Sequence, residues 1–241
     1  MDSETAEQLA GIHESTGRLL SSAGALTDDQ AAAPSRLPGW TRGHVLTHLA
    51  RNADGLRNLL HWARTGTRTP MYPSEAARDE AIAAGAGRSA TDLTADLSQS
   101  AAAFAAAAAE LPAPAWAAQV ERRGQPFPAR DILRTRLSEL EFHHVDLGTG
   151  YPAGGWPAVF VADALPRVAG SFTGRPDMTA CRLVPDGWPD SFLVGPARPD
   201  PPDVVVRGTP AQLLAWLSGR ADGTGLQVTG AATVPVPPPW G

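Results

Sequence analysis

Residues 136–147, which read RLSELEFHHVDL, carry two helical stripes side by side. Side chains three or four residues apart share one face of a helix. The apolar stripe comprises Leu133, Leu137, Leu140, His144 and Leu147, and the more polar stripe comprises Ile132, Arg136, Glu139, His143 and Asp146. The pattern predicts a bundle helix from about Pro128, a residue suited to a first helical turn, to Leu147.

The polar stripe contains an acid–histidine pair with the spacing of a metal site. Glu139 and His143 are four residues apart, so both side chains can reach one ion. Zinc accepts carboxylate oxygen and imidazole nitrogen. Glu141 and His144 form a rival pair at the i, i+3 spacing of di-iron bundles, which need that motif twice and two further carboxylates. The sequence holds no second copy, so spacing favours Glu139 and His143 without excluding the rival pair.

A second predicted helix supplies two candidate histidines, His44 and His48. Thr41 is suited to cap this helix, which is expected to run to about Arg64. The predicted inner side chains are Val45, His48, Leu49, Asn52, Leu56 and Leu59. His48 lies nearer the middle of this inner stripe than His44. Because a lone histidine is more often a partly buried imidazole than a ligand, the residues alone leave a metal site and a purely structural role both open.

The other patterns predict two domains, an N-terminal four-helix bundle over residues 1–150 and a small α+β domain over residues 151–241. In the bundle, further helices are expected at Glu4–Ser22 and Thr91–Leu111, with a long loop from Gly66 to Gly87. In the second domain, helices are expected at Pro157–Ala169 and from Pro210 to Leu217, and strands at Cys181–Val184, Ser191–Val194, Asp203–Arg207 and Leu226–Thr229. The proline-rich segment Val234–Trp240 is expected to pack as an extended arm.

Charge and hydropathy argue against two classes of partner. The formal charge of the 241 residues is −5, and their 20 basic residues are scattered, so a nucleic-acid surface is not expected. No apolar run approaches the roughly 20 residues that span a bilayer, and the first residues lack the pattern of a secretory signal. A cytoplasmic protein with no membrane partner is therefore expected.

Cys181 is the single cysteine. It lies in a strand-like segment, where a small buried side chain is the simpler expectation than a nucleophile. Intramolecular disulfides and multi-cysteine metal clusters are excluded. Any thiol chemistry would need a thiol from another molecule.

The block Gly39–Leu49, read with Glu139–Gly148, resembles the mycothiol-dependent maleylpyruvate isomerases, which belong to the DinB-like metal-binding bundles. The resemblance continues through Asn58–Ala63, Thr65–Gly66, Thr69–Tyr72, Glu75–Arg78, Ser218–Arg220 and Val234–Trp240, and so spans nearly the whole chain. The bundle motifs are shared by a broad superfamily with several thiol-dependent chemistries. The Thr69–Tyr72 loop and the second domain point more narrowly to the isomerase.

The resemblance implies a set of site residues. Its metal ligands fall on His48, Glu139 and His143, with zinc as the expected ion, and its essential arginine falls on Arg220 in a sterol-carrier-protein-like second domain. Arg78 and Tyr72 are expected to bind substrate, although a solvated loop arginine and a packing tyrosine are the plainer alternatives. Asp146 could orient a ligand imidazole, and His61 could line the pocket. One departure is Leu140-Glu141-Phe142, where relatives carry Val-Trp-Ile or similar residues; this is expected to alter the pocket wall but not the ligands.

The implied activity is conversion of maleylpyruvate to fumarylpyruvate in gentisate degradation, by metal-activated thiolate addition, bond rotation and elimination, with mycothiol as the thiol cofactor. Two alternatives remain at this stage. A mycothiol S-transferase would share the metal and the thiol but not the elimination. A non-catalytic metal-binding module would have a closed coordination sphere and no need of Arg220.

Overall fold

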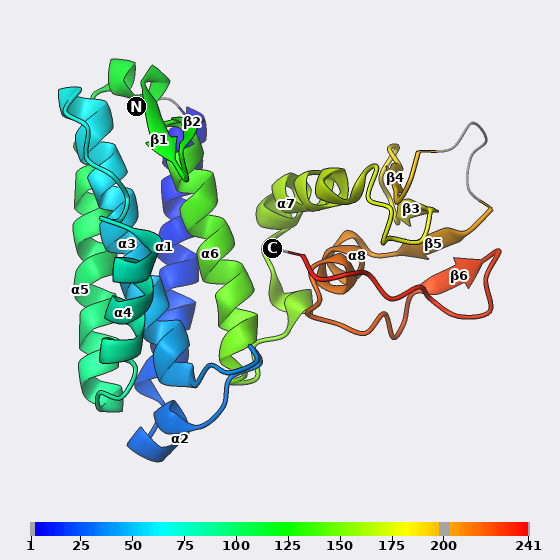
Figure 1. Cartoon of the computed structure of the whole chain (residues 1–241), viewed down its shortest axis with the longest axis horizontal. Coiled ribbons are helices and arrows are strands. Elements are labelled where there is room, and N and C mark those ends of the chain that lie inside the picture. Colours follow the sequence, from blue (N-terminus) through cyan, green and yellow to red (C-terminus); the bar gives the residue numbers. More distant parts are fainter. Residues whose placement is uncertain (1–2, 198–202, 241) are drawn as a thin grey trace. The chain divides into compact units, whose positions relative to one another are not determined.

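The computed structural model describes residues 3–197 and 203–240. The chain divides into two compact units, Met1–Gly150 and Tyr151–Gly241. The first is helical and the second is a small sheet with helices (Figure 1). This confirms the predicted fold class.

Four long helices form the bundle of the first unit: α1 (Ser3–Gly24), α3 (Arg42–Thr65), α5 (Ala90–Ala109) and α6 (Asp131–Leu147). Both α3 and α1 pack against α5 and α6 (Figure 1). The predicted inner side chains of α3 are all buried. As a result α3 and α6, the two helices that carry the candidate ligands, lie next to each other.

Thr41 sets the start of α3. Its side chain accepts a hydrogen bond from the His44 backbone amide, and the His44 ring in turn accepts one from the Thr41 amide at 3.2 Å. These bonds satisfy amides that a helix start leaves without partners. Gly66 ends the helix in a left-handed conformation with φ of 73°. The predicted helix from Thr41 to about Arg64 is confirmed.

Two expectations for the first unit are wrong. The predicted loop from Gly66 to Gly87 contains helix α4 (Glu75–Gly85), which begins at a Ser74 cap. Helix α4 buries only Ile82, so its sequence has no apolar stripe from which a helix could be predicted. In addition, Pro128 lies in a strand, and α6 begins at Asp131. Proline is found in edge strands as well as in the first turn of a helix. Pro128 alone therefore does not show whether a strand or a helix contains it.

That strand belongs to a hairpin that the sequence analysis missed. Strand β1 (Gln119–Arg122) pairs antiparallel with β2 (Gln125–Pro128). The turn consists of Arg123 and Gly124, both with positive φ, at 51° and 73°. Such two-residue turns usually read Asn-Gly or Asp-Gly, and Arg-Gly gives no comparable signal. The short helices α2 (Asp28–Ala32) and η1 (Ala113–Ala117) complete this unit.

The second unit contains a four-stranded sheet in the order β4-β3-β5-β6. Its strands are β3 (Cys181–Pro185), β4 (Phe192–Val194), β5 (Val205–Gly208) and β6 (Gln227–Thr229), and its helices are η2 (Ala153–Gly155), α7 (Ala158–Phe172) and α8 (Pro210–Leu217). Among the paired strands of this sheet that the structure describes, β3 and β5 run parallel and the other two pairs run antiparallel. The predicted strands and helices of this unit all occur, with ends shifted by up to three residues.

The segment Val234–Trp240 has no regular secondary structure, as expected of an extended arm. The Trp216 indole donates to the Pro235 carbonyl at 2.9 Å, and Arg175 donates to the Pro239 carbonyl at 3.1 Å. In the described part of the chain, no helix combines the length and apolar character needed to cross a membrane.

Gly55 lets the Thr69–Tyr72 loop lie directly on α3. A methyl group at this position would stand 2.7 Å from Met71 Cγ and 2.9 Å from the Met71 carbonyl oxygen. Asn58, one turn further on, donates to the same carbonyl at 3.4 Å. The absence of a side chain at Gly55 therefore helps to set the position of Tyr72.

We expect Gly55→Ala to lower the free energy of unfolding by about 1 kcal/mol, because overpacking costs about 1–3 kcal/mol and exceeds the gain of up to about 1 kcal/mol from alanine in a helix. Gly17→Ala in α1, where no atom lies within 4 Å, is the matched control and should stabilise. Urea unfolding of both variants measures the difference. Equal effects of the two changes would contradict the proposed packing.

Candidate metal centre

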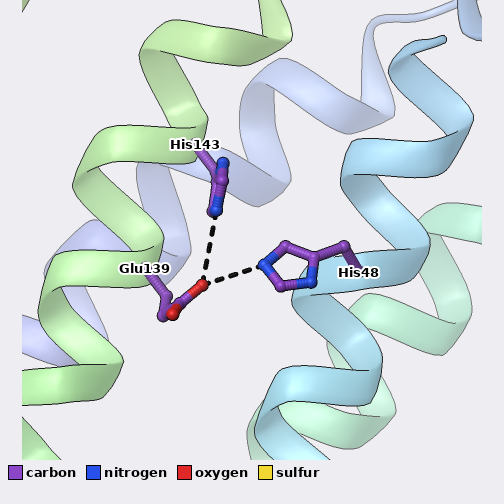
Figure 2. A group of neighbouring side chains, drawn as sticks. All are labelled: His48, Glu139 and His143. Carbon is purple, nitrogen blue, oxygen red and sulfur yellow. Dashed lines mark hydrogen bonds and ion pairs between the residues drawn. The ribbon is translucent and has the colours of Figure 1, made fainter. Parts of the chain in front are cut away.

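Glu139 lies between two histidines that come from two helices. Its Oε2 atom is 2.9 Å from Nε2 of His48 on α3 and 3.4 Å from Nε2 of His143 on α6 (Figure 2). One ligand atom from each of these residues falls within 4.8 Å of the other two. The structure thus brings together the three residues on which the implied metal ligands fall.

The three side chains are largely shielded from water, with exposed fractions of 6% for His48, 18% for His143 and 19% for Glu139. The two imidazoles meet edge to face with ring centres 4.7 Å apart. Trp40 packs edge to face against His48 with ring centres 5.6 Å apart. Shielding of this kind strengthens electrostatic interactions among the three groups.

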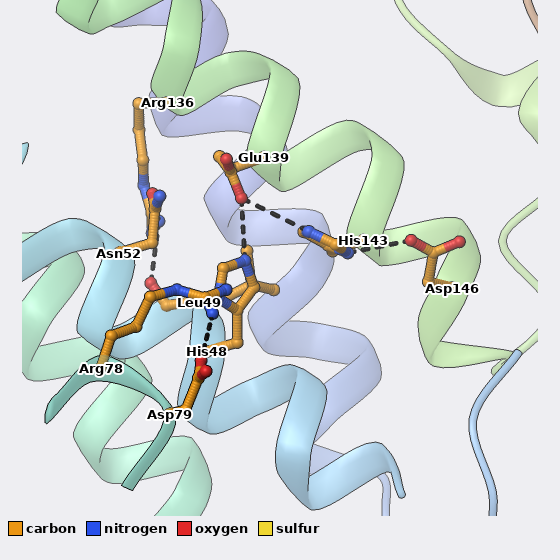
Figure 3. A network of polar contacts seen from close by, with 9 residues as sticks. All are labelled: His48, Leu49, Asn52, Arg78, Asp79, Arg136, Glu139, His143 and Asp146. Atoms are coloured by element: carbon orange, nitrogen blue, oxygen red, sulfur yellow. Dashed lines mark hydrogen bonds and ion pairs between the residues drawn. The ribbon is translucent and has the colours of Figure 1, made fainter. Parts of the chain in front are cut away.

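Each histidine is fixed through its second nitrogen (Figure 3). His143 Nδ1 donates to Asp146 Oδ2 at 2.9 Å, and His48 Nδ1 accepts from Arg78 Nη2 at 3.3 Å. A carboxylate behind an imidazole is a common means of orienting a ligand ring. Asp146 therefore has the contact expected of an orienting residue, and Arg78 reaches the centre from α4.

Burial and the hydrogen bonds of the triad shift the pKa values of Glu139, His48 and His143. Burial alone would raise the pKa of Glu139, but hydrogen bonds from His143 and His48 hold it well below its usual range. Burial lowers the pKa of His48. The pKa of His143 is raised, because its bonds to Asp146 and Glu139 outweigh burial. The centre thus contains an ionised carboxylate and, at His48, an imidazole held neutral, which are forms that bind a cation.

A buried arginine of α6 supports this centre through hydrogen bonds to α3. In the sequence it is recognisable only as a member of the polar stripe. Arg136 is 0% exposed, and it donates to the Leu49 carbonyl at 2.8 Å and to Asn52 Oδ1 at 3.0 Å (Figure 3). Burial lowers its pKa to about 10. Leu49 follows His48, so Arg136 ties α6 to α3 at the level of the ligands.

The donor set fits a divalent ion. Two imidazole nitrogens and one carboxylate oxygen are the ligands of many catalytic zinc sites with three protein ligands. Glu139 Oε2 and the two Nε2 atoms converge on one point of the bundle. A divalent cation satisfies the same three atoms.

The rival residues face elsewhere. His44 serves the Thr41 cap. Glu141 accepts from Ser15 and from Arg18 of α1, the latter at 2.8 Å, and His144 bonds Ser22 of α1 at 2.8 Å. The expectation that residues 140–142 alter the pocket wall is wrong, because the pocket lining lacks all three and Glu141 points to α1.

A pocket of about 300 Å³ adjoins the triad and includes His48 and Glu139 in its lining. Tyr72 and Arg78, the expected substrate-binding residues, also line it. So do residues 121–124 of the missed hairpin. His61 does not; it lies in a separate groove between α3 and α5.

Two predicted residues lie in the second unit. Arg220 follows α8, and its Nη1 donates to the Ser218 carbonyl at 3.0 Å. Cys181 is 0% exposed in β3, and burial raises the pKa of its thiol to about 12. Cys181 is a core side chain, as expected.

Family models and solved structures that match this chain name the same family over nearly its whole length. A family model described as "Mycothiol maleylpyruvate isomerase N-terminal domain" matches residues 12–148, and one described as "MDMPI C-terminal domain" matches residues 155–237. Two crystal structures are similar, one of the mycothiol-dependent maleylpyruvate isomerase and one of a histidine-to-alanine variant of it. Each is 30% identical, covers 98% of this chain and 97% of its own, and superposes with a TM-score of 0.89. No curated protein matches in the corresponding sequence search.

Two glutamates on α6 give a matched test of the metal centre. We expect Glu139→Gln to weaken Zn²⁺ binding by at least about 100-fold, since loss of mere supporting contacts around a metal already costs 10–100-fold. Glu141→Gln, the same change two residues away, should leave the affinity unchanged. Competition with a chromogenic chelator measures both. Equal Zn²⁺ affinities of the two variants would show that Glu139 is not a ligand.

We expect His144 to make the stability of the fold depend on pH. Burial, followed by the charge of Arg18, lowers its pKa from 6.5 to about 4. Between these values the unfolded chain binds a proton that the folded chain does not, so the free energy of unfolding should fall as pH falls, by up to about 1.4 kcal/mol per pH unit. Urea midpoints of the parent and His144→Asn, compared from pH 7 to about 4, should show the smaller decline in the variant. A constant difference would contradict this role.

Proposed function

The chain belongs to the mycothiol maleylpyruvate isomerase family, and on that basis we propose that it converts maleylpyruvate to fumarylpyruvate with mycothiol as its thiol cofactor. The observation that carries the proposal is the triad of His48, Glu139 and His143 beside an arginine-lined pocket. The reaction is a cis–trans isomerisation, in which reversible addition of a thiol to the alkene permits rotation about the former double bond.

His48, Glu139 and His143 would hold the metal, which we propose to be zinc. Three protein ligands leave a coordination position open, and the ion would there lower the pKa of the mycothiol thiol. Asp146 keeps the His143 ring oriented through its Nδ1 hydrogen. Arg136 maintains the separation of the two ligand helices.

The thiol must come from outside the chain. Cys181 is the single cysteine, it is fully buried, and its pKa of about 12 keeps it protonated near neutral pH. A neutral buried thiol is a poor nucleophile. An external thiol such as mycothiol supplies what the sequence lacks. Because that thiol has to be kept reduced, we also propose a cytoplasmic location.

Arg78 has a role that depends on the state of His48. In this structure Arg78 donates to His48 Nδ1. That nitrogen can accept only if the ring hydrogen of His48 is on Nε2. If Nε2 binds a cation, the ring hydrogen moves to Nδ1, which can then no longer accept from Arg78. Arg78 would be released toward the pocket that it already lines, where a guanidinium can pair with a substrate carboxylate. Tyr72 lines the same pocket and would donate its hydroxyl hydrogen to the substrate.

Arg220 is the residue of the second unit that we propose to act in the reaction. A guanidinium forms paired hydrogen bonds with a carboxylate or an enolate oxygen, and so could stabilise charge that develops on the substrate. This assignment extends the resemblance at Ser218–Arg220.

The deciding experiment follows fumarylpyruvate formation from maleylpyruvate with and without mycothiol. We expect conversion only with mycothiol, and loss of it after chelation with recovery on adding Zn²⁺. Turnover that is independent of mycothiol would refute the proposal. Formation of a stable mycothiol adduct in place of fumarylpyruvate would identify a transferase instead.

The same assay tests Arg220. Arg220→Lys keeps the charge but loses the fork of donors, so we expect kcat/KM to fall by about 10-fold or more. Arg167→Lys on α7, which changes an arginine of an exposed i, i+4 ion pair in the same unit, is the control and should retain full activity. Equal rates for the two variants would remove Arg220 from the mechanism.

A further inference from the structure

The β1–β2 hairpin supplies part of the pocket wall that no expectation for the site included. The pocket lining contains Glu121, Arg122, Arg123 and Gly124 together with His48 and Glu139 of the metal centre. β1 packs against α3. The hairpin therefore belongs to the same cavity as the triad.

The arginines of this cavity differ in what they already bind. Arg68 pairs with Glu121 at 3.0 Å, and Arg78 pairs with Asp79 at 2.6 Å. Arg122 forms no ion pair with any carboxylate in residues 3–197 and 203–240. Its Nε atom is buried and has no hydrogen-bond partner there. A buried donor without a partner is unfavourable. Because Arg122 lines the pocket, an anion bound there would offset the charge of its guanidinium group.

Packing fixes the Arg122 side chain. Its guanidinium carbon lies 5.8 Å from the ring centre of Phe127, on the partner strand of the hairpin. The guanidinium thus has a defined position on an apolar support, which reduces the conformational entropy lost when it binds a ligand. Arg123, by contrast, is exposed at the tip of the turn.

The turn itself holds an unusual backbone conformation. Arg123 is the one non-glycine residue with positive φ in the described chain, at 51°. Arg122 pairs with Gln125 directly across the turn. A two-residue hairpin turn of this kind requires positive φ at both of its positions, and this fixes where the strand residue before it lies. Here the two-residue turn anchors Arg122 at the pocket.

Tyr72 connects Arg122 with the rest of the cavity. Burial, followed by the charge of Glu139, raises the pKa of the Tyr72 phenol to about 12, against the opposing charges of Arg78 and Arg122. The hydroxyl therefore keeps its hydrogen near neutral pH and lies within electrostatic reach of both arginines. A phenol donor near two guanidinium groups is a suitable environment for a carboxylate.

We infer that Arg122 binds a carboxylate of the substrate and makes the pocket specific for dicarboxylates. This inference rests on the proposed function, because maleylpyruvate has two carboxylates. Mycothiol does not need such a partner, since apart from its thiol it is an uncharged pseudodisaccharide amide. Arg122 should therefore affect binding of the substrate and leave binding of the thiol unchanged.

Kinetics in which maleylpyruvate and mycothiol are varied in turn, each with the other saturating, test the inference. The variants are Arg122→Gln, Arg122→Lys and the control Arg130→Gln, which alters an exposed arginine outside the pocket lining. We expect Arg122→Gln to raise KM for maleylpyruvate by about 10–100-fold, the range of a charge-assisted hydrogen bond. KM for mycothiol should stay unchanged. Arg122→Lys should recover part of the loss, and Arg130→Gln should match the parent. An unchanged KM for maleylpyruvate, or an equal rise in KM for mycothiol, would overturn the inference.

Calorimetric binding of fumarylpyruvate without mycothiol separates this inference from the proposed function. We expect the parent and Arg130→Gln to bind with the same Kd, and Arg122→Gln to bind about 10-fold or more weakly. If the parent binds fumarylpyruvate through Arg122 but does not isomerise maleylpyruvate, the dicarboxylate site stands and the proposed function fails. If the parent isomerises and Arg122→Gln binds normally, the function stands and the role of Arg122 is refuted.

Discussion

The contact of Glu139 with His48 and His143 is the constraint on which the rest of the site depends. It joins α3 to α6 through polar groups in a bundle whose other contacts are largely apolar. A buried carboxylate is unfavourable without partners, and here the two imidazoles supply them. Neighbouring residues maintain the arrangement, with Asp146 behind His143, Arg78 behind His48, and Arg136 tying the two helices together.

The chemistry of the site is divided among separate groups. The bundle provides three side chains that could hold a cation and a pocket with guanidinium groups, whereas the one thiol of the chain is buried in the core of the second unit. A buried thiol with a raised pKa avoids competing with an external thiol for the metal. The family's use of mycothiol thus agrees with where this chain keeps its cysteine.

Several arginines serve different purposes according to their surroundings. Arg136 is fully buried and structural, with a pKa lowered to about 10. Arg78 contacts His48, a candidate metal ligand, and Arg122 packs against Phe127 in the β1–β2 hairpin. Location rather than residue type therefore decides which guanidinium groups are available to an anionic substrate.

The sequence by itself determined the elements that periodicity and caps encode: the four long helices, the Thr41 start of α3, the strands of the second unit and the burial of Cys181. It also placed Glu139 and His143 on one helical face, because residues four apart must project together. Helical spacing did not exclude His44 or Glu141, since His44 shares a helix face with His48, and Glu141 has a histidine of its own three residues on. The resemblance pointed to His48, Glu139 and His143, and packing gives the physical reason, because Glu141 and His144 point toward α1 whereas His48 faces α6. The hairpin, α4 and the positions of Arg122 and Arg136 likewise follow from contacts between segments distant in sequence, which no local pattern records.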